Sequence, residues 1–125
     1  MILDSSALIA SIDEEKGKEV VDRYLPYAVM STVNITEVAT YMMRRDRMDL
    51  RKVRTIVDNL LLEIVPYDEE QAFLAAELCA KTKHKGLSLG DRACLALAIT
   101  RDLPVLTADK AWKELQVGAK IQVIR

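Results

Sequence analysis

Residues 87–99, LSLGDRACLALAI, place a serine and an acid before a run that is apolar at every position from Ala93 to Ile99. Ser88 and Asp91 have the spacing of a capping box, in which an N-cap serine and an acid three positions later satisfy each other's backbone N–H groups. The apolar run leaves no wide polar face, so it predicts a helix that is buried on all sides. We therefore expect this stretch to be the central helix of the domain.

Short apolar segments and longer helical patterns alternate along the rest of the chain. Strands are predicted at residues 2–3, 28–30, 64–65, 105–106 and 121–124. Helices are predicted at residues 5–12, 14–25, from 35 through 42, 53–61, from 72 to near Gly86, and 109–115, from the i, i+3, i+4 spacing of apolar residues and from turn residues. Strands separated by helices imply crossover connections. The pattern thus predicts an α/β fold with three layers, α/β/α, around a small central parallel sheet.

Composition limits the class of protein. The 125 residues are half apolar, enough for one core, and we expect a single domain over residues 1–125. A net charge of −1 and a pI near 5.9 argue against a protein that binds nucleic acid by overall basicity.

Cys79 and Cys94 lie in helical apolar patterns, and no signal peptide is evident, which is typical of reduced core thiols in the cytoplasm. No apolar run approaches the roughly 20 residues of a membrane span, and we expect a cytoplasmic protein.

Four acidic residues, Asp4, Glu37, Asp91 and Asp109, each lie near the start of a predicted helix. If the strands are parallel, their C-terminal ends share one edge, which brings these carboxylates into one crevice. Oxygen-only ligands suit Mg²⁺ or Mn²⁺, so the pattern predicts a divalent-metal site.

Helix capping is the simpler explanation for each acid taken alone, because the free N–H groups and the dipole at a helix N-terminus stabilise a carboxylate. Asn34 and Glu37 even have a spacing similar to that of the capping box at Ser88 and Asp91. Capping does not explain four acids at matching places in the architecture. We therefore favour the metal site.

Four blocks of the chain resemble the PIN-domain ribonucleases, and within them the VapC-type toxins of bacterial and archaeal toxin–antitoxin pairs. The blocks are residues 2–9 (ILDSSALI), 31–38 (STVNITEV), 87–98 (LSLGDRACLALA) and 106–109 (LTAD). Matched position by position, the acidic quartet of the family falls on the four acids above, and its supporting hydroxyls fall on Ser6 and Thr107. Only three residues precede Asp4, so the first strand must be short.

The resemblance implies a PIN-like fold and a metal-dependent endoribonuclease that cleaves RNA. Mg²⁺ or Mn²⁺ would be held chiefly by Asp4, Asp91 and Asp109, and Glu37 would orient the attacking water or a second ion. The implied partners are a second copy of the chain, giving a homodimer, and a small antitoxin that covers the acidic crevice. Four carboxylates in one crevice also raise one another's pKa values, so a bound cation should stabilise the fold.

Basic residues near the acids are candidates for phosphate contacts. Arg44 and Arg45 end the helix that carries Glu37, and Arg92 directly follows Asp91. The alternative is that the first two interact with the helix dipole and that the third is solvated.

A second basic cluster, Lys81, Lys83 and Lys85, surrounds His84, the only histidine. Without histidine or cysteine partners at ligand spacing, His84 gives no indication of zinc or of a catalytic triad, and we interpret it as a loop residue.

Three questions stay open at this level. A phosphoryl-transfer or phosphatase-like domain would also place acids at strand ends, although it would want an aspartate where Ser6 stands. A catalytically silent module with a structural metal is the other alternative. The apolar stripe at Tyr41, Met42 and Met43 is either core packing or a contact with a second copy or an antitoxin.

Overall fold

The computed structural model describes residues 1–82 and 85–125 and contains one sheet of five strands, in the order β3-β2-β1-β4-β5. The strands are β1 (Ile2–Leu3), β2 (Val29–Ser31), β3 (Glu63–Val65), β4 (Val105–Thr107) and β5 (Ile121–Val123). Every neighbouring pair is parallel, as the alternation of strands and helices predicts. β1 lies in the centre, paired with β2 on one side and with β4 on the other.

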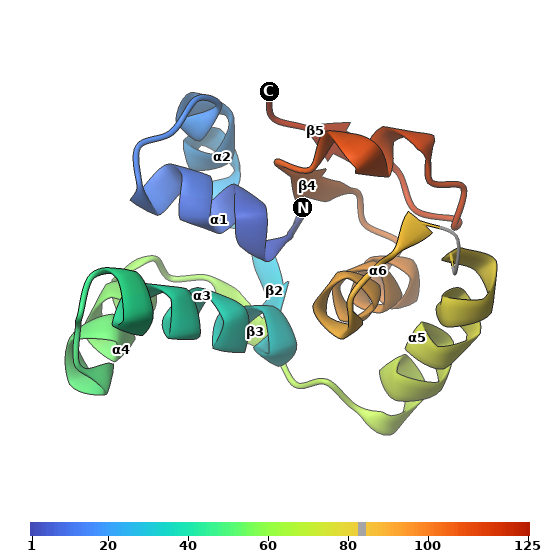
Figure 1. Ribbon diagram of the computed structural model, residues 1–125, viewed down its shortest axis with the longest axis horizontal. Helices are drawn as coiled ribbons and strands as arrows, with labels where there is room; N and C mark the ends of the chain where they lie inside the picture. The colour runs from blue at the N-terminus through green and yellow to red at the C-terminus, as the bar shows by residue number, and fades with distance from the viewer. Residues whose placement is uncertain (83–84) are drawn as a thin grey trace.

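Helices cover both faces of the sheet, so the three-layer prediction is confirmed (Figure 1). They are α1 (Ser5–Ile12), α2 (Lys18–Tyr24), α3 (Thr32–Arg45), α4 (Leu50–Asn59), α5 (Glu69–Thr82) and α6 (Leu89–Arg101), with the short 3₁₀ helices η1 (Leu25–Tyr27) and η3 (Lys110–Glu114). The first four α-helices lie on one side of the strands in Figure 1, and α5 and α6 lie on the other. Within the described residues no helix has the length and apolar character to cross a membrane.

The core is divided between the two faces because successive side chains of a strand point in opposite directions. Ile2 and Val105 belong to the core beneath α5 and α6, whereas Leu3 and Leu106 belong to the core beneath α1 to α4. All six residues from Ala93 to Ala98 are buried, so α6 is the central helix that its sequence predicts.

Several helix boundaries differ from the prediction by a few residues, and the short helix expected at residues 109–115 is the 3₁₀ helix η3. The start of α2 differs as well. The helix expected from Glu14 begins only at Lys18, because Gly17 adopts a left-handed conformation with φ of 96°. A Cβ on Gly17 would lie 2.8 Å from a side-chain carbon of Ile124, near the C-terminus of the chain. The turn before α2 therefore depends on the left-handed Gly17, which also lies against the far end of the sequence, a contact that local periodicity does not contain.

Candidate active site

The C-terminal ends of the three central strands gather the predicted site residues. Asp4 follows β1 directly, and its backbone N–H donates to Leu106 O of β4 at 3.0 Å. Asp109 lies two residues beyond the end of β4, and β2 ends at the N-cap of α3, the helix that carries Glu37. Asp91 lies in the first turn of α6. Charge interactions link Asp4 to Glu37 and Asp91, and Asp91 to Asp109, so the fold brings the four acids into one neighbourhood.

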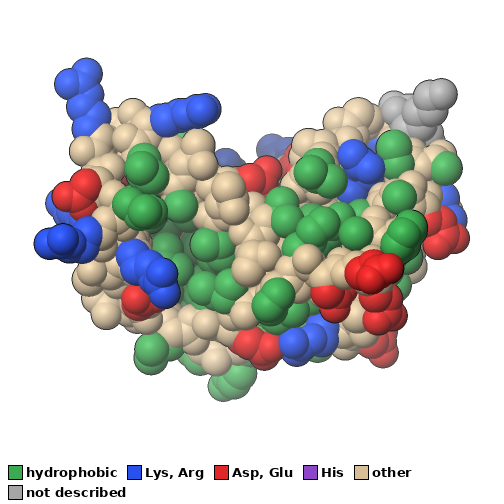
Figure 2. Space-filling model, turned by 90° about the horizontal axis from the view of Figure 1, so that it is seen from below, with side chains coloured by type: hydrophobic (Ala, Val, Ile, Leu, Met, Phe, Trp, Pro, Cys, Tyr) green, Lys and Arg blue, Asp and Glu red, His purple; other side chains and the backbone are tan. Residues whose placement is uncertain are grey.

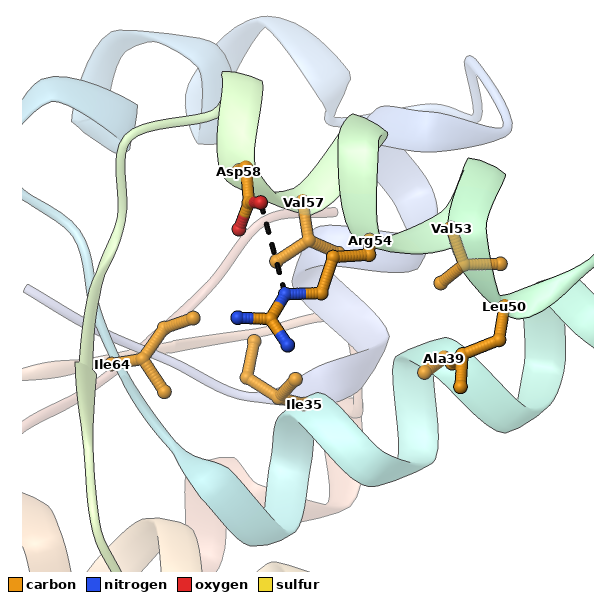
Figure 3. Close-up of a pocket in the computed structure, with 8 residues that line it drawn as sticks. All are labelled: Ile35, Ala39, Leu50, Val53, Arg54, Val57, Asp58 and Ile64. Carbon is orange, nitrogen blue, oxygen red and sulfur yellow. Dashed lines mark ion pairs between the residues drawn. The ribbon is translucent and has the colours of Figure 1, made fainter.

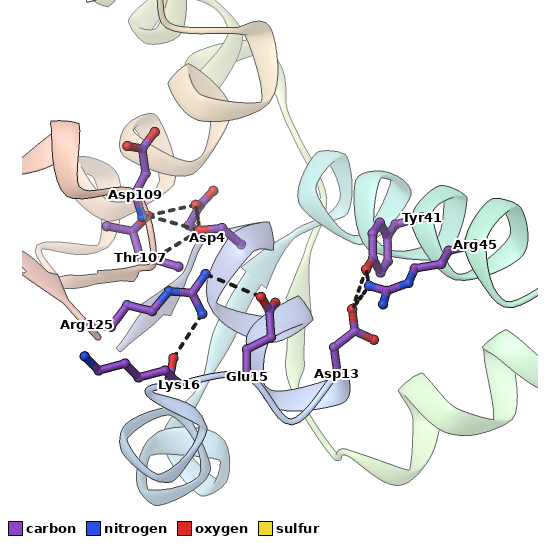
Figure 4. A network of polar contacts seen from close by, with 11 residues as sticks. Asp4, Asp13, Glu15, Lys16, Tyr41, Arg45, Thr107, Asp109 and Arg125 are labelled. Atoms are coloured by element: carbon purple, nitrogen blue, oxygen red, sulfur yellow. Dashed lines mark hydrogen bonds and ion pairs between the residues drawn. The ribbon is translucent and has the colours of Figure 1, made fainter.

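Asp4 is the buried member of the group, with 4% of its surface exposed. Its Oδ2 accepts a hydrogen bond from Ser6 Oγ at 2.5 Å and one from Thr107 Oγ1 at 2.9 Å (Figure 4). Thr107 Oγ1 in turn accepts the backbone N–H of Asp109 at 3.1 Å, and Ser6 Oγ accepts that of Ala108 at 3.0 Å. The two hydroxyls predicted to support the site therefore lie against Asp4 and connect it to the loop that carries Asp109.

Burial raises the pKa of Asp4 to about 6, because a charged carboxylate loses its hydration inside the protein. The hydroxyls of Ser6 and Thr107 oppose this shift, and the negative charges of Asp91 and Glu37 add to it. Burial likewise raises the pKa of Asp91, with contributions from Glu37 and Asp109, while its capping bonds to Ser88 act in the other direction. The site is thus electrostatically unfavourable without a cation.

Two of the four acids also cap helices. Asp91 Oδ2 accepts the backbone N–H of Ser88 at 2.9 Å, and Ser88 Oγ accepts that of Asp91 at 3.1 Å, which confirms the predicted capping box. Asp109 Oδ1 accepts the backbone N–H of Ala111 at 3.0 Å at the start of η3. Asp4 occupies the N-cap of α1 but makes no capping bond.

Glu37 lies inside α3, and its spacing from Asn34 does not form a capping box. The N-cap of α3 is Ser31, whose hydroxyl accepts Val33 N at 3.1 Å. Glu37 Oε1 instead accepts hydrogen bonds from Ser5 Oγ at 2.5 Å and from Asn34 Nδ2 at 2.8 Å. Ser5 carried no signal in the sequence, and Asn34 was marked only by its three-residue spacing from Glu37, which was interpreted as a possible capping box.

Each of the four carboxylates keeps one oxygen free. Every hydrogen bond that these side chains accept from the described residues goes to a single oxygen, and the other oxygen accepts none. None of the four acids forms an ion pair with a lysine or arginine that the structure describes. Four free, uncompensated carboxylate oxygens are the donor set that Mg²⁺ or Mn²⁺ prefers. The free atoms are Asp4 Oδ1, Glu37 Oε2, Asp91 Oδ1 and Asp109 Oδ2.

The carboxylates nonetheless form an open set. Within residues 1–82 and 85–125, no three acidic, cysteine or histidine side chains are close enough together to enclose an ion as they stand. Holding a cation here therefore requires the side chains to turn toward it, which their free oxygens permit.

The arginines proposed for phosphate contact differ in whether their side chains already have partners within the protein. Arg45 forms an ion pair with Asp13 at 2.6 Å, and its guanidinium lies 5.6 Å from the ring centre of Tyr41. Figure 4 shows this cluster apart from Asp4, Thr107 and Asp109. Arg45 thus has a structural partner that its position at a helix C-terminus did not indicate.

Arg92 lies close to one of the acids. Its Nε donates to Ser88 O at 3.3 Å, so its side chain lies along the capping box that holds Asp91. Arg44 is exposed at the end of α3. Lys81 and Lys85 are exposed as well, whereas the predictions for Lys83 and His84 lie outside the described residues.

An apolar groove lies between α3 and α4, away from the acids. Its cavity volume is about 200 Å³, and Figure 3 shows the Arg54–Asp58 ion pair, at 3.7 Å, among otherwise apolar side chains. Hydrophobic side chains gather in a hollow at the left of Figure 2, where α3 and α4 lie in Figure 1. The groove is lined by Ile35, Ala39, Leu50, Val53, Arg54, Val57, Asp58 and Ile64.

The apolar stripe at residues 41–43 has a different explanation from the groove. Met42 is fully buried in the core, the Tyr41 hydroxyl bonds to Asp13, and Met43 is 40% exposed. Core packing and the Asp13 cluster account for most of this stripe, and the open apolar surface of α3 is the face toward α4.

The structure is a parallel sheet between helices, with acids at the ends of its central strands, which agrees with the PIN-like fold that the motifs predict. The chain matches the PIN domain family over residues 1–118. It is 33% identical over 115 residues to ribonuclease VapC42 of Mycobacterium tuberculosis, an alignment that covers 85% of this chain and 88% of that protein. It is 28% identical over 129 residues to ribonuclease VapC5 of the same organism, covering 99% and 93%. The chain therefore belongs to the PIN-domain family and, within it, to the VapC ribonucleases, as its motifs indicate.

Solved structures agree with this fold. A toxin–antitoxin complex from Klebsiella pneumoniae contains a chain that superposes with a TM-score of 0.78 at 17% identity, covering 99% of this chain and 97% of that one. A chain of the VapBC-5 toxin–antitoxin system of Mycobacterium tuberculosis superposes with a TM-score of 0.64 at 25% identity, covering 99% and 96%.

Proposed function

We propose that this chain is a divalent-metal-dependent endoribonuclease that hydrolyses RNA phosphodiester bonds, and that it is the toxin of a VapBC-type toxin–antitoxin pair. The observation that carries the proposal is the set of four carboxylates, each with one oxygen secured by the protein and one left free. RNA as the substrate is supported by the relatives, which are named as ribonucleases.

The ion would be held by the free oxygens of Asp4, Asp91 and Asp109, with Glu37 beside them. A bound Mg²⁺ or Mn²⁺ supplies Lewis-acid polarisation of the scissile phosphate and lowers the pKa of water at the site. Ser6 and Thr107 hold Asp4 Oδ2 and so leave Oδ1 for the ion, an arrangement in which neighbouring donors orient a metal ligand.

Helices α6 and α3 hold the carboxylates of Asp91 and Glu37 in position for the reaction. The capping box fixes Asp91 Oδ2 on the first turn of α6 and leaves Oδ1 free. Glu37 Oε2 is free to accept a hydrogen bond from the water that attacks phosphorus in line with the leaving oxygen. Arg92 lies beside Asp91, where its guanidinium can contact a phosphate of the bound RNA.

The test is cleavage of a mixed pool of structured RNAs by the purified chain with Mg²⁺, with Mn²⁺ and with EDTA. Asp91→Asn is the matched control, because asparagine still offers an oxygen to Ser88 N and preserves the cap. We expect metal-dependent cleavage that falls by at least about a hundredfold in the folded variant. Cleavage that survives either EDTA or the substitution would contradict the proposal.

The alternatives are distinguished by two further measurements, Mn²⁺ binding and beryllofluoride trapping. A silent module binds Mn²⁺ but cuts no RNA. A phosphatase-like domain would form a beryllofluoride adduct at Asp4, and it is disfavoured by Ser6, which donates to Asp4 where a second aspartate would be needed.

The proposed partner is a small antitoxin that binds across the helices. Solved chains of similar fold come from toxin–antitoxin complexes. The groove between α3 and α4 offers an apolar surface, with Leu50 62% and Ile64 39% exposed, that suits the apolar face of a partner helix.

A further inference from the structure

Three residues around Glu37 carry an inference beyond the four acids. Glu37 is exposed on α3, and a glutamate without contacts samples several rotamers. Here its Oε1 is held by Ser5 from α1 and by Asn34 from its own helix, at 2.5 and 2.8 Å. The two bonds hold one oxygen of the carboxylate, so the direction of the free Oε2 depends on both of these neighbours.

Asn34 ties Glu37 to the helix that carries Asp91. It is fully buried, and its Nδ2 also donates to Gly90 O of α6 at 3.0 Å. Both contacts are acceptors, so turning the amide over would place oxygen against oxygen, and the orientation of the side chain is set. Its Oδ1 is buried without a hydrogen-bond partner among the described residues, a cost that an apolar side chain would not carry. Packing alone therefore does not account for this asparagine.

Gly90 leaves the space that Glu37 occupies. A Cβ on Gly90 would lie 2.5 Å from Glu37 Cδ, and side-chain carbons do not approach other atoms that closely. Gly90 is helical, and it is not among the residues with positive φ, so its backbone does not require glycine. Alanine would favour the helix at this position, so the lack of a side chain on Gly90 is explained by the space that Glu37 needs.

We propose that Ser5, Asn34 and Gly90 form a cradle that positions Glu37 relative to Asp91 for RNA hydrolysis, an inference that rests on the proposed function. The three are positioning residues, because they act on the reaction only through Glu37. The cradle links α1, α3 and α6 at one point, so the direction of Glu37 Oε2 is coupled to the packing of these helices.

The test compares Gly90→Ala and Asn34→Ala with the wild type. The matched control is Thr36→Ala on the same helix, since the Thr36 hydroxyl bonds to Thr32 O, at 3.0 Å, and makes none of the cradle contacts. Three quantities are measured for each protein: kcat and KM for RNA cleavage, and the Mn²⁺ dissociation constant by electron paramagnetic resonance. We expect both cradle variants to lose roughly 10- to 100-fold in kcat with little change in KM, and Thr36→Ala to resemble the wild type.

A double-mutant cycle separates positioning from a general structural effect. In a Glu37→Ala background there is no carboxylate to displace, so Gly90→Ala should change neither kcat nor Mn²⁺ affinity further. Wild-type kcat in a folded Gly90→Ala protein, or an equal loss with and without Glu37, would overturn the proposal. If Asn34→Ala does not fold, the Gly90 cycle decides alone.

The same measurements distinguish failure of the cradle from failure of the function. A wild type that binds Mn²⁺ and cuts RNA, with cradle variants that do the same, removes the cradle only. A wild type that neither binds Mn²⁺ nor cuts RNA removes the proposed function and the cradle with it.

Discussion

Asp4 is a buried carboxylate without a cationic partner, and the free energy of folding depends on whether it carries a proton. Its pKa is raised from 3.8 to about 6 in the folded chain, so the folded state binds the proton more tightly than the unfolded state. The stabilisation from this proton is complete below the unfolded pKa and is lost as the pH rises through the folded one. For the metal-free protein the loss between pH 4 and pH 7 is roughly 2 kcal/mol.

Asp4→Asn should remove this pH dependence, because the amide does not titrate. We expect the variant to show a flatter free energy of unfolding from pH 4 to pH 7 than the wild type, and to be the more stable protein in EDTA at pH 7.5. Urea denaturation at a series of pH values measures both. Asp58→Asn is the control, since Asp58 is exposed in a surface ion pair. Equal slopes for wild type and Asp4→Asn would show that Asp4 is not the titrating group.

Several site residues have two tasks at once, which is why capping and metal binding were hard to separate from sequence. Asp91 and Asp109 each use one carboxylate oxygen to accept a backbone N–H at a helix N-terminus, and their other oxygen accepts no hydrogen bond from the described residues. Helix capping and metal binding are therefore compatible at these positions, because one oxygen of each carboxylate caps a helix and the other is available to a metal ion.

At the scale of the element, the first turn of α6 contributes to stability through its capping box and to the active site through Asp91. Removing the Ser88 hydroxyl breaks half of the capping box, which we expect to cost about 1 kcal/mol of stability. The same change loosens Asp91, so Ser88→Ala should also reduce RNA cleavage. Thermal denaturation and initial cleavage rates measure the two effects.

A cap far from the acids provides the matched comparison. Asp49 caps α4 by accepting Lys52 N at 2.9 Å, and α4 carries none of the four acids. Asp49→Ala should therefore cost about 1 kcal/mol as well, but leave cleavage unchanged at temperatures where the protein is folded. Equal losses of activity in both variants would mean that the effect of Ser88 is on stability alone.

At the scale of the whole molecule, the two sides of the sheet have different surfaces. α3 and α4 present an apolar groove, and α5 presents Phe73, which is 71% exposed. Exposed apolar surface of this kind is typical of a protein that assembles with partners. The homodimer and the antitoxin contact, which the family resemblance implies, are the two uses that we propose for it.

Assembly is tested by light scattering after size exclusion at micromolar concentration. We expect twice the 14.1 kDa mass of the chain, and a single species at the monomer mass would contradict the homodimer. Leu50→Glu, in the groove, should weaken the complex with the proposed antitoxin, because it places a charge on the apolar surface. Phe73→Glu on the opposite side is the control. Loss of the complex in the control alone would move the contact to α5.

The sequence by itself determined the elements, their order and the acidic quartet. Helix periodicity, strand alternation and the Ser88–Asp91 capping box depend on residues within a few positions of one another, so they are legible along the chain. The parallel sheet followed from the alternation of strands and helices, and the common edge of its strands indicated the neighbourhood of the acids.

Only the tertiary structure decided what surrounds each acid. Asn34 bonds to Gly90 across 56 positions and Arg45 pairs with Asp13 across 32, and neither contact has a periodic or spacing signal. The close approach of Ile124 to Gly17, just before α2, joins opposite ends of the chain in the same way. Such contacts depend on how the helices pack against the sheet and against one another, to within an ångström. That packing is a property of the folded molecule as a whole, and no local stretch of sequence contains it.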